Sequence, residues 1–325
     1  MSIRDLPGSV AALSGGVGGA KLAFGLSRAL GPALTVVVNT GDDFEHLGLR
    51  ISPDIDSVIY ALSGLSDEER GWGRAGETWQ FMEALKLLDG EAWFQLGDKD
   101  LAMHVERTHR LASGETLTKV TGSLARRLGI KSLIVPTTDG PLATTVVTED
   151  GTLPFQRYFV EQRCAPVVKA IHFDHTEYSP VTQDVLRALA APDLAAVILC
   201  PSNPYLSIDP ILAVPGMRAA LGDVHAPVIA ISPIIGGQAI KGPTTKIMSE
   251  IGVPATNEAI ARHYKGLIDA LVIDLQDVGE APCGVEVHAT STLMRSLADR
   301  DRLANEVLDF AARLSNGHAA KGTRE

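Results

Sequence analysis

The feature that most constrains the fold is a glycine-rich run, SGGVGGAK at residues 14–21, that stands between two short apolar segments. The apolar segments are residues 10–13 and 34–39, and an amphipathic stretch, residues 22–26, follows the glycines. The order strand, tight turn, helix, strand is typical of the first βαβ unit of a doubly wound sheet. Glycines let the backbone approach an anion closely, and a helix N-terminus offers unpaired N–H groups. The run therefore predicts a phosphate-bearing ligand.

The glycine run departs from both common phosphate-binding patterns. A P-loop requires Lys followed by Ser or Thr, whereas Lys21 precedes Leu22. A dinucleotide fingerprint requires a small residue three positions beyond Gly18, and Lys21 stands there. An NAD-type oxidoreductase is therefore disfavoured. A turn that only closes the strand–helix joint is an alternative, although four glycines in five residues exceed what such a turn needs.

Composition excludes several classes of protein. The formal net charge of −10 argues against nucleic acid or an anionic membrane as the main partner. Cys164, Cys200 and Cys283 are widely separated and form no CxxC pair, which predicts a reducing cytoplasm rather than a disulfide framework or a zinc site. We expect neither a signal peptide nor a membrane span, because no apolar run has the required length.

The pattern along the 325 residues predicts one α/β domain with a Rossmann-like, mostly parallel sheet and helices on both faces. Residues 57–127 are more polar and helical in pattern, and we interpret them as a largely helical subdomain inserted in this domain. The polar tail, residues 316–325, is expected to be disordered. Further strand candidates are residues 132–135, 144–148, 167–171, 194–199, 228–231 and 270–273.

Polar or glycine- and proline-rich loops follow several of these strands. Ligands of open α/β sheets bind at the carboxyl ends of the strands, so loops that converge there would form a cleft. The candidate loops are residues 39–43, 136–139, 201–204 and 232–237. The loop at 201–208 carries two prolines around Ser202 and Asn203, and it could bind a base or ribose or be a plain turn.

Four aspartates, Asp42, Asp43, Asp54 and Asp56, cluster early in the chain. One alternative for Asp54 or Asp56 is a purely structural role, as the N-cap of a helix that starts near residue 53. For the cluster as a whole we favour a site that binds a hard cation or activates a hydroxyl group. Carboxylate oxygens suit Mg²⁺, which commonly bridges to phosphates.

A second dense group of charges, LGDKD at residues 96–100, precedes His104, Arg107, His109 and Arg110. These residues predict either a solvated helix with local ion pairs or a cationic lip for a substrate phosphate. The chain has no HExxH motif and no GxSxG elbow, so metalloprotease and α/β-hydrolase functions lose support.

Taken together, the motifs resemble the 2-phospho-L-lactate transferase (CofD/FbiA) family. They occur in family order and span about residues 12–295, nearly the whole chain. The matching motifs are SGGVGGAK at 14–21, VNTGDD at 38–43, ISPDID at 51–56, LGDKD at 96–100, PSNP at 201–204 and SPIIG at 232–236.

The resemblance implies a role in making the deazaflavin coenzyme F420. Members of this family transfer a phospho-acyl group from a guanosine diphosphate-linked donor to a hydroxyl of the deazaflavin Fo, with Mg²⁺, and release GMP. The group could be 2-phospholactate, phosphoenolpyruvate or 3-phosphoglycerate, which no motif here distinguishes. The family also implies a homodimer.

The resemblance further implies roles for individual residues. Asp54 and Asp56 would be catalytic, and Asp42, Asp43 and Asp54 would bind the metal. Asp54 and Lys99 would contact Fo, with Trp72 and Trp79 as possible walls of its slot. The residues expected at the donor nucleotide and its phosphates are Gly15, Gly16, Gly18, Gly19, Lys21, Ser202 and Asn203.

The nearest alternative is a YvcK-like protein that binds nucleotide sugars and has a regulatory role. That family shares the glycine-rich opening, but it tends toward a glycine- and serine-rich segment after the second-strand aspartates. Here the sequence FEHLGL at residues 44–49 leads into SPD at 52–54, which favours the transferase.

Overall fold

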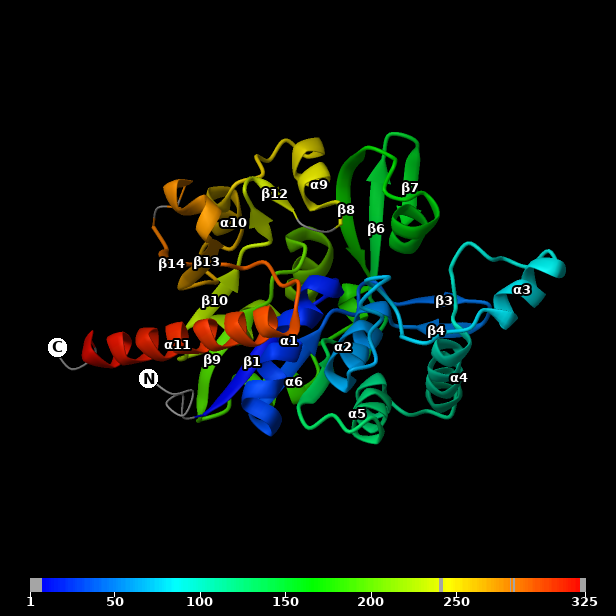
Figure 1. The fold of residues 1–325 in the computed structure, drawn as a ribbon, viewed down its shortest axis with the longest axis horizontal. Coiled ribbons are helices and arrows are strands. Elements are labelled where there is room, and N and C mark those ends of the chain that lie inside the picture. The colour runs from blue at the N-terminus through cyan, green and yellow to red at the C-terminus, as the bar shows by residue number, and fades with distance from the viewer. Residues whose placement is uncertain (1–7, 240–241, 281, 283, 322–325) are drawn as a thin grey trace.

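The computed structural model describes residues 8–239, 242–280, 282 and 284–321. Its centre is a seven-stranded sheet in the order β14-β13-β10-β9-β1-β2-β5 (Figure 1). All neighbouring strands of this sheet run parallel, as expected. The strands are β1 Ser9–Ser14, β2 Leu34–Val38, β5 Leu133–Pro136, β9 Leu194–Leu199, β10 Val228–Ile231, β13 Ala270–Asp274 and β14 Glu286–Thr290.

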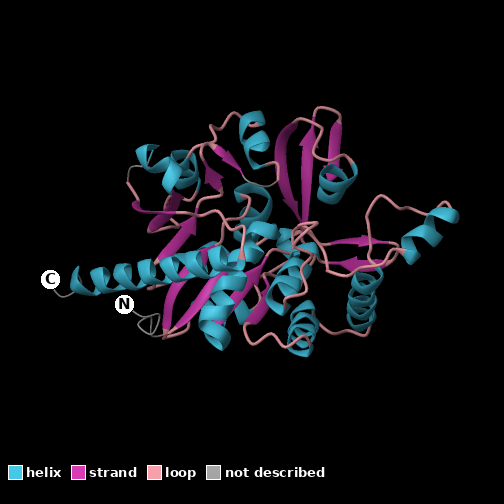
Figure 2. Cartoon of the chain, in the orientation of Figure 1, coloured by secondary structure: helices cyan, strands magenta, loops and turns pink. Residues whose placement is uncertain are grey.

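Helices cover both faces of this sheet (Figure 2). Successive side chains of a strand point to opposite faces, so Val10 and Ala12 of β1 enter one hydrophobic core while Ala11 and Leu13 enter the other. The first core includes α1 Gly16–Leu30, α2 Pro53–Ser63, α5 Leu117–Arg127 and α11 Leu297–Lys321. The second includes α6 Gln183–Leu189, α7 Asp209–Ala213, α8 Met217–Gly222, α9 Thr244–Glu250 and α10 Asn257–His263. The expected layering is confirmed.

The strand order reverses between β1 and β9. From β1 the chain passes outward to β2 and β5, and after the chain returns to β9 it passes outward in the other direction. The segments that leave the carboxyl ends of β1 and β9 therefore diverge. Such a switch point opens a crevice at the sheet edge, which is where ligands of open α/β sheets bind.

Two smaller sheets are added to this core. β3 Phe44–His46 and β4 Leu49–Ile51 form a hairpin, and β6 Ala143–Thr148 lies between β7 Gly151–Pro154 and β8 Val168–Asp174 in an antiparallel sheet. The strand candidates 144–148 and 167–171 thus belong to an outer sheet. The segment 57–127 holds most of α2 together with α3 Gln80–Leu87, α4 Asp98–Ala112 and α5, and α3 projects beyond β3 and β4 (Figure 1).

The sequence analysis missed the edge strand β14. Its sequence, EVHAT, alternates in polarity and holds no apolar run, because an edge strand has only one neighbour and its side chains are partly exposed. Pairing with β13, in which Ala270 lies opposite Glu286, creates this strand.

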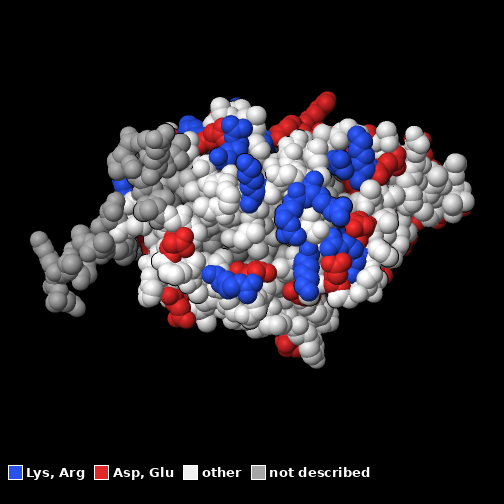
Figure 3. Space-filling view, turned by 90° about the horizontal axis from the view of Figure 1, so that it is seen from below, with Lys and Arg blue, Asp and Glu red and all other residues white. Residues whose placement is uncertain are grey.

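Basic and acidic side chains are mixed on the part of the surface that Figure 3 shows. Lys and Arg side chains on the face seen from below gather in groups that have Asp and Glu beside them (Figure 3). Within the described residues, no helix is long and apolar enough to cross a membrane. α11 runs to Lys321, and residues 322–325 of the expected tail lie outside the described residues. Cys164 and Cys200 are free thiols, and Cys283 is likewise outside the described part.

Candidate active site

A cavity of about 1210 Å³ opens at the carboxyl edge of the central sheet. Loops that follow β1, β2, β9, β10 and β14 all contribute to its lining, as the prediction of converging loops requires. The loop after β5 does not, since Asp139 instead accepts a hydrogen bond of 2.7 Å from the Thr118 amide at the start of α5. The strand-end residues that line the cavity include Gly15, Gly16, Gly18, Asp42, Pro201, Ser202, Asn203, Ser232, Pro233, Thr292 and Met294.

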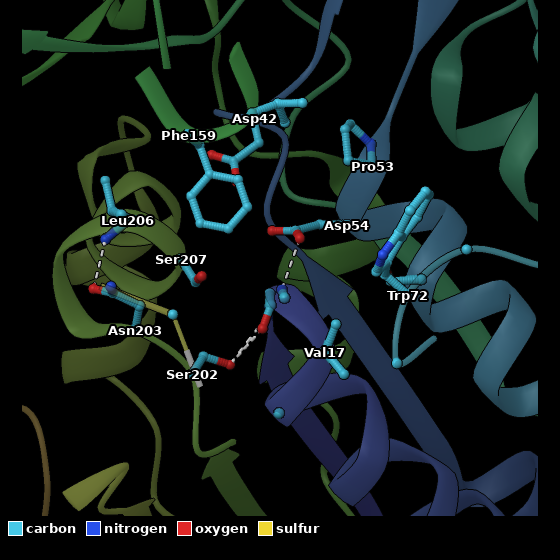
Figure 4. A pocket seen from close by; sticks show the side chains of 18 of the residues that line it. Val17, Asp42, Pro53, Asp54, Trp72, Phe159, Ser202, Asn203, Leu206 and Ser207 are labelled. Carbon is cyan, nitrogen blue, oxygen red and sulfur yellow. Dashed lines mark hydrogen bonds between the residues drawn. The ribbon is translucent and has the colours of Figure 1, made fainter. Parts of the chain in front are cut away.

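The glycine run and the loop after β9 are bonded to each other directly. The Ser202 hydroxyl donates to the Gly15 carbonyl at 2.8 Å and accepts from the Gly15 amide at 3.3 Å (Figure 4). Asn203 accepts hydrogen bonds from the amides of Tyr205 and Leu206 at 3.0 and 3.2 Å. Its buried Nδ2 has no hydrogen-bond partner within the described chain. Ser202 therefore holds the loop in place, and Asn203 has a donor left for a ligand.

Several glycines of the run have no room for a side chain, because other protein atoms lie close to their Cα atoms. A Cβ at Gly18 would lie 2.5 Å from the Pro201 carbonyl oxygen, and one at Gly19 would lie 2.5 Å from the Ser202 hydroxyl. Gly16 has a φ of +63°, which other L-residues rarely adopt. Gly15, Gly16 and Gly18 line the cavity as expected for donor binding, whereas Gly19 is buried and does not.

Gly19→Ala is expected to lower the free energy of unfolding by about 1–3 kcal/mol, because the methyl group overpacks a site bounded by Ser14 and Ser202. Urea denaturation measures this loss. The matched control is Gly122→Ala within α5, where the nearest atom is 3.4 Å from the new Cβ. That change should stabilise the protein by up to about 1 kcal/mol through helix propensity. Equal changes in the free energy of unfolding for the two substitutions would contradict the conclusion that Gly19 lacks room for a methyl group.

Asp54 joins the glycine run to the loop after β2. Its Oδ1 accepts from the Gly16 amide at 2.7 Å, and its Oδ2 accepts from Asn39 Nδ2 at 2.9 Å (Figure 4). Asn39 Oδ1 in turn accepts from the Gly41 amide at 2.7 Å. The expectation that Asp54 or Asp56 is an N-cap is wrong. Ser52 is the N-cap of α2, Pro53 begins the helix, and both aspartates lie in its first turn.

Asp42 and Asp43 bring further negative charge to the same place. Asp42 is buried and Asp43 is half-buried, and the Oδ1 atom of each is buried without a hydrogen-bond partner among the described residues. Asp43 Oδ2 accepts from the Ser52 hydroxyl at 2.7 Å. Asp42 lines the cavity, and Asp43 does not.

Burial gives these carboxyl groups unusual acidities. Desolvation raises the pKa of Asp54 to about 6 and that of Asp43 to about 8, against an ordinary value of 3.8. Burial and the neighbouring Asp54 raise the pKa of Asp42 well above that value. Crowded, buried carboxylates with unpartnered oxygens fit a bound divalent cation, which would compensate their charge.

Stability of the metal-free protein should fall as pH rises from about 4 to 8. The raised pKa values mean that folded Asp43 and Asp54 retain protons that the unfolded chain has already released, so the folded state loses stability with rising pH. Unfolding measured with a chelator at several pH values tests this. Asp43→Asn should flatten the slope, and the exposed-site control Asp184→Asn should leave it unchanged.

Asp56 also lines the cavity, and it belongs to a buried ion-pair network. Both of its oxygens face the guanidinium of Arg107, with Nη1 at 3.1 Å from Oδ2 and Nη2 paired with Oδ1. His104 Nδ1 lies 3.6 Å from Asp56, and its Nε2 lies 3.3 Å from Asp100, which also accepts from the Tyr60 hydroxyl. Asp56, Asp100 and His104 have the spacing of a metal site, but Arg107 already supplies a cation there.

His104 and Arg107 do not lie on a solvated helix face, because α4 turns them inward, where they are 1% and 0% exposed. His104 is among the residues that line the cavity, and Arg107 is not. The two basic residues that follow are near the surface of α4, and Arg110 pairs with Glu115 at 2.6 Å.

Two lysines expected at the substrates have different positions. Lys21 lines the cavity, and its ammonium group donates to the Met294 carbonyl at 3.1 Å. Lys99 is not among the residues that line the cavity, and its amide donates to Glu77 at the start of α4. The Fo contact of Lys99 therefore stays a prediction, and its position does not favour it.

Aromatic side chains form part of the cavity lining. Trp72 is among them as expected, whereas Trp79 lies behind it, with ring centroids 6.5 Å apart. The sequence analysis did not assign the other aromatic wall residues, although aromatic residues make up only 5% of the chain and several stand together near residues 72–94. Those wall residues are Tyr60, Trp93, Phe94, Phe155 and Phe159.

Comparison with known proteins identifies the family of this chain. The sequence profile described as 2-phospho-L-lactate transferase CofD matches residues 10–312. The chain belongs to this transferase family. That membership favours the transferase interpretation over the YvcK-like alternative, and it identifies the cavity as the candidate active site of a transferase.

Named relatives of this family match along nearly their whole length. A phosphoenolpyruvate transferase of Streptomyces griseus is 37% identical over 313 residues, 93% of this chain and 98% of the relative. The enzyme of the same name from Kitasatospora aureofaciens is 38% identical, covering 95% and 99%. That of Mycobacterium ulcerans is 40% identical, covering 88% and 91%.

A solved structure shares the fold. The crystal structure of a UPF0052 family member from Bacillus halodurans superimposes with a TM-score of 0.64 at 14% sequence identity, covering 93% of this chain and 99% of that one. At this identity the likeness supports the α/β architecture alone.

Proposed function

We propose that this chain transfers a phosphoenolpyruvyl group from a guanosine diphosphate-linked donor to the ribityl hydroxyl of the deazaflavin Fo, releasing GMP, in the biosynthesis of coenzyme F420. The observation that carries the proposal is one cavity that combines the glycine-rich N-terminus of α1 with the buried carboxyl groups of Asp42 and Asp54. The names of the relatives favour phosphoenolpyruvate over 2-phospholactate and 3-phosphoglycerate.

The transfer is a displacement at phosphorus. The acceptor hydroxyl oxygen bonds to the phosphorus that carries the enolpyruvyl group, the bridging P–O bond breaks, and GMP leaves with that bonding pair. Such a reaction needs in-line placement and neutralisation of charge rather than a covalent intermediate on the protein. Gly16, Val17, Gly18 and Lys21 line the cavity, where the backbone of this first turn of α1 and the Lys21 ammonium group would bind the donor diphosphate.

The aspartates of the acidic cluster would supply the metal ligands and the proton acceptor. Mg²⁺ would be held by Asp42 and Asp54, with Asp43 nearby, and would neutralise charge on the phosphates. The hydroxyl proton passes to Asp54, which lines the cavity and whose carboxylate meets two neutral donors, the Gly16 amide and Asn39 Nδ2. Asp56 is a poorer acceptor because Arg107 engages both of its oxygens.

Incubation with Fo, Mg²⁺ and each of the three guanylylated donors, followed by mass spectrometry of the deazaflavin, tests the proposal. We expect the mass gain of one phosphoenolpyruvyl group, stoichiometric GMP and little product without Mg²⁺. A larger yield with another donor would reassign the acyl group. Absence of any mass gain with all three donors would refute the transferase. The homodimer expected from the family stays a prediction that gel filtration with light scattering can test.

A further inference from the structure

One buried side chain outside the cavity lining, that of Asn39, connects segments that carry two of the cavity aspartates. Asn39 directly follows β2, is 0% exposed and is not among the residues that line the cavity. Its backbone amide donates to the Ser14 carbonyl at 3.0 Å, which continues the pairing of β2 with β1 beyond the last residue of the strand. The side chain is therefore anchored where the sheet ends and the glycine run begins.

The partners of Asn39 fix the orientation of its side-chain amide. Oδ1 accepts from the Gly41 amide at 2.7 Å, and a backbone amide can only donate. Nδ2 donates to Asp54 Oδ2 at 2.9 Å and to the Leu206 carbonyl at 3.4 Å, and both of these atoms are acceptors. A half-turn of the side-chain amide would set oxygen against two acceptors and nitrogen against a donor. Only one orientation satisfies all three contacts.

These bonds connect the turn that carries Asp42 to the helix that carries Asp54. Gly41 directly precedes Asp42, and it packs so closely that a Cβ there would lie 3.1 Å from Asn39 Oδ1. Asp54 belongs to the first turn of α2, a different element. Because both aspartates line the cavity, the Asn39 side chain sets the separation of two carboxylates without lying in the cavity itself.

Asn39 also holds Asp54 without compensating its charge. The side-chain amide is neutral, and so is the Gly16 amide that donates to the other oxygen of Asp54 at 2.7 Å. Asp56, two residues further along α2, instead meets the guanidinium group of Arg107 with both oxygens. A carboxylate that is oriented by neutral donors keeps its negative charge for a ligand, whereas the charge of Asp56 is already paired.

We propose that Asn39 is a positioning residue of the transfer reaction. It orients the Asp54 carboxylate and fixes the turn that carries Asp42, and it acts through these two aspartates from outside the cavity lining. The inference rests on the proposed function, because Asp42 and Asp54 are the carboxylates that the reaction uses.

Steady-state kinetics of Asn39→Ala and Asn39→Asp tests the inference. We expect kcat to fall about 10–100-fold, the usual cost of removing a group that orients a ligating side chain, while the KM values for Fo and for the donor stay nearly unchanged. Asn39→Asp keeps an oxygen for the Gly41 amide and loses the donor to Asp54. A wild-type kcat in Asn39→Asp would therefore reduce Asn39 to a turn residue and overturn the inference.

Thr137→Val is the matched control. Thr137 follows the neighbouring strand β5, is 0% exposed, donates its hydroxyl hydrogen to the Val38 carbonyl at 2.7 Å and lies outside the cavity lining. The variant should unfold at a lower urea concentration than the wild type and keep the wild-type kcat. Equal losses of kcat in Thr137→Val and Asn39→Ala would indicate a general effect of losing a buried hydrogen bond and would also overturn the inference.

Hydrogen exchange of the Gly16 amide, followed by NMR of the metal-free protein, gives a readout that needs no turnover. Gly16 begins α1, so its amide has no acceptor within the helix, and Asp54 Oδ1 accepts from it at 2.7 Å. If Asn39 orients Asp54, this amide should exchange about 10-fold faster in Asn39→Ala, as for one lost hydrogen bond to a charged group, and at the wild-type rate in Thr137→Val.

The two readouts separate this inference from the proposed function. Faster Gly16 exchange in Asn39→Ala, in a protein whose wild type forms no product with any donor, would support the positioning role and refute the proposed reaction. Unchanged exchange in Asn39→Ala would overturn the positioning role even if the wild type makes product. If Asn39→Ala does not fold, the same two measurements on Asn39→Asp give the answer.

Discussion

Asp54→Asn is expected to lower kcat about 10³-fold, the upper end of what one lost electrostatic group at a transfer site usually costs. The carboxylate accepts from both the Gly16 amide and Asn39 Nδ2, and a side-chain amide cannot accept at both of its terminal atoms. If Asn39 turned to compensate, its oxygen would leave the Gly41 amide. The substitution also removes one charge from the proposed Mg²⁺ site.

Product formation at saturating Fo, donor and Mg²⁺ measures this effect. Asp184→Asn is the matched control, because it removes the carboxylate of an exposed ion pair with Arg187 and lies outside the cavity lining. Its kcat should equal that of the wild type. Full turnover by Asp54→Asn would remove Asp54 from the mechanism, and Asp42 would become the remaining candidate for the proton acceptor.

Arg107→Ala should lower the free energy of unfolding by about 3–5 kcal/mol, the usual cost of removing one partner of a buried ion pair. The guanidinium is fully buried and meets both oxygens of Asp56, so its loss leaves a buried carboxylate without its cation. Urea denaturation near pH 7, followed by two spectroscopic probes to check two-state behaviour, gives the value.

The double variant Asp56→Asn with Arg107→Met provides the control for this network. It replaces both charges, so it should be clearly more stable than Arg107→Ala. At the surface, Arg187→Ala breaks the exposed pair with Asp184 and should cost less than about 1 kcal/mol. An Arg107→Ala loss as small as that of the surface pair would show that water reaches Asp56.

The local pattern of apolar residues was sufficient to predict most strands of the central sheet. The runs at 10–13, 34–39, 194–199, 228–231 and 270–273 each correspond to a central strand, because strands buried on both faces must be apolar throughout. β14 escaped detection because its five residues alternate in polarity instead of forming the continuous apolar run by which the central strands were found.

The candidate site was predicted in part for a similar reason. Loops after parallel strands meet at one edge, so Asp42 and Ser202 could be placed at a common cleft before their contacts were known, and the family resemblance added Lys21 and Asp54. Asp43 and Gly19 were also assigned to ligands, and neither is among the residues that line the cavity. Sequence position cannot distinguish a residue that lines a cavity from one that supports it.

By itself, the sequence determined the doubly wound architecture, the family and the glycine run at the first strand–helix turn, since each is recognised from short runs of residues and from their order along the chain. Only the tertiary structure decided what surrounds that run. Ser202, which holds Gly15, is 187 residues away, and Arg107, which neutralises Asp56, is 51 residues away. These contacts bury charge and exclude water, and neither burial nor charge compensation is a property of a single segment. The absence of side chains at these glycines therefore has two consequences. It allows the loop after β9 to pack against them, and it leaves space for the ligand proposed to bind beside them.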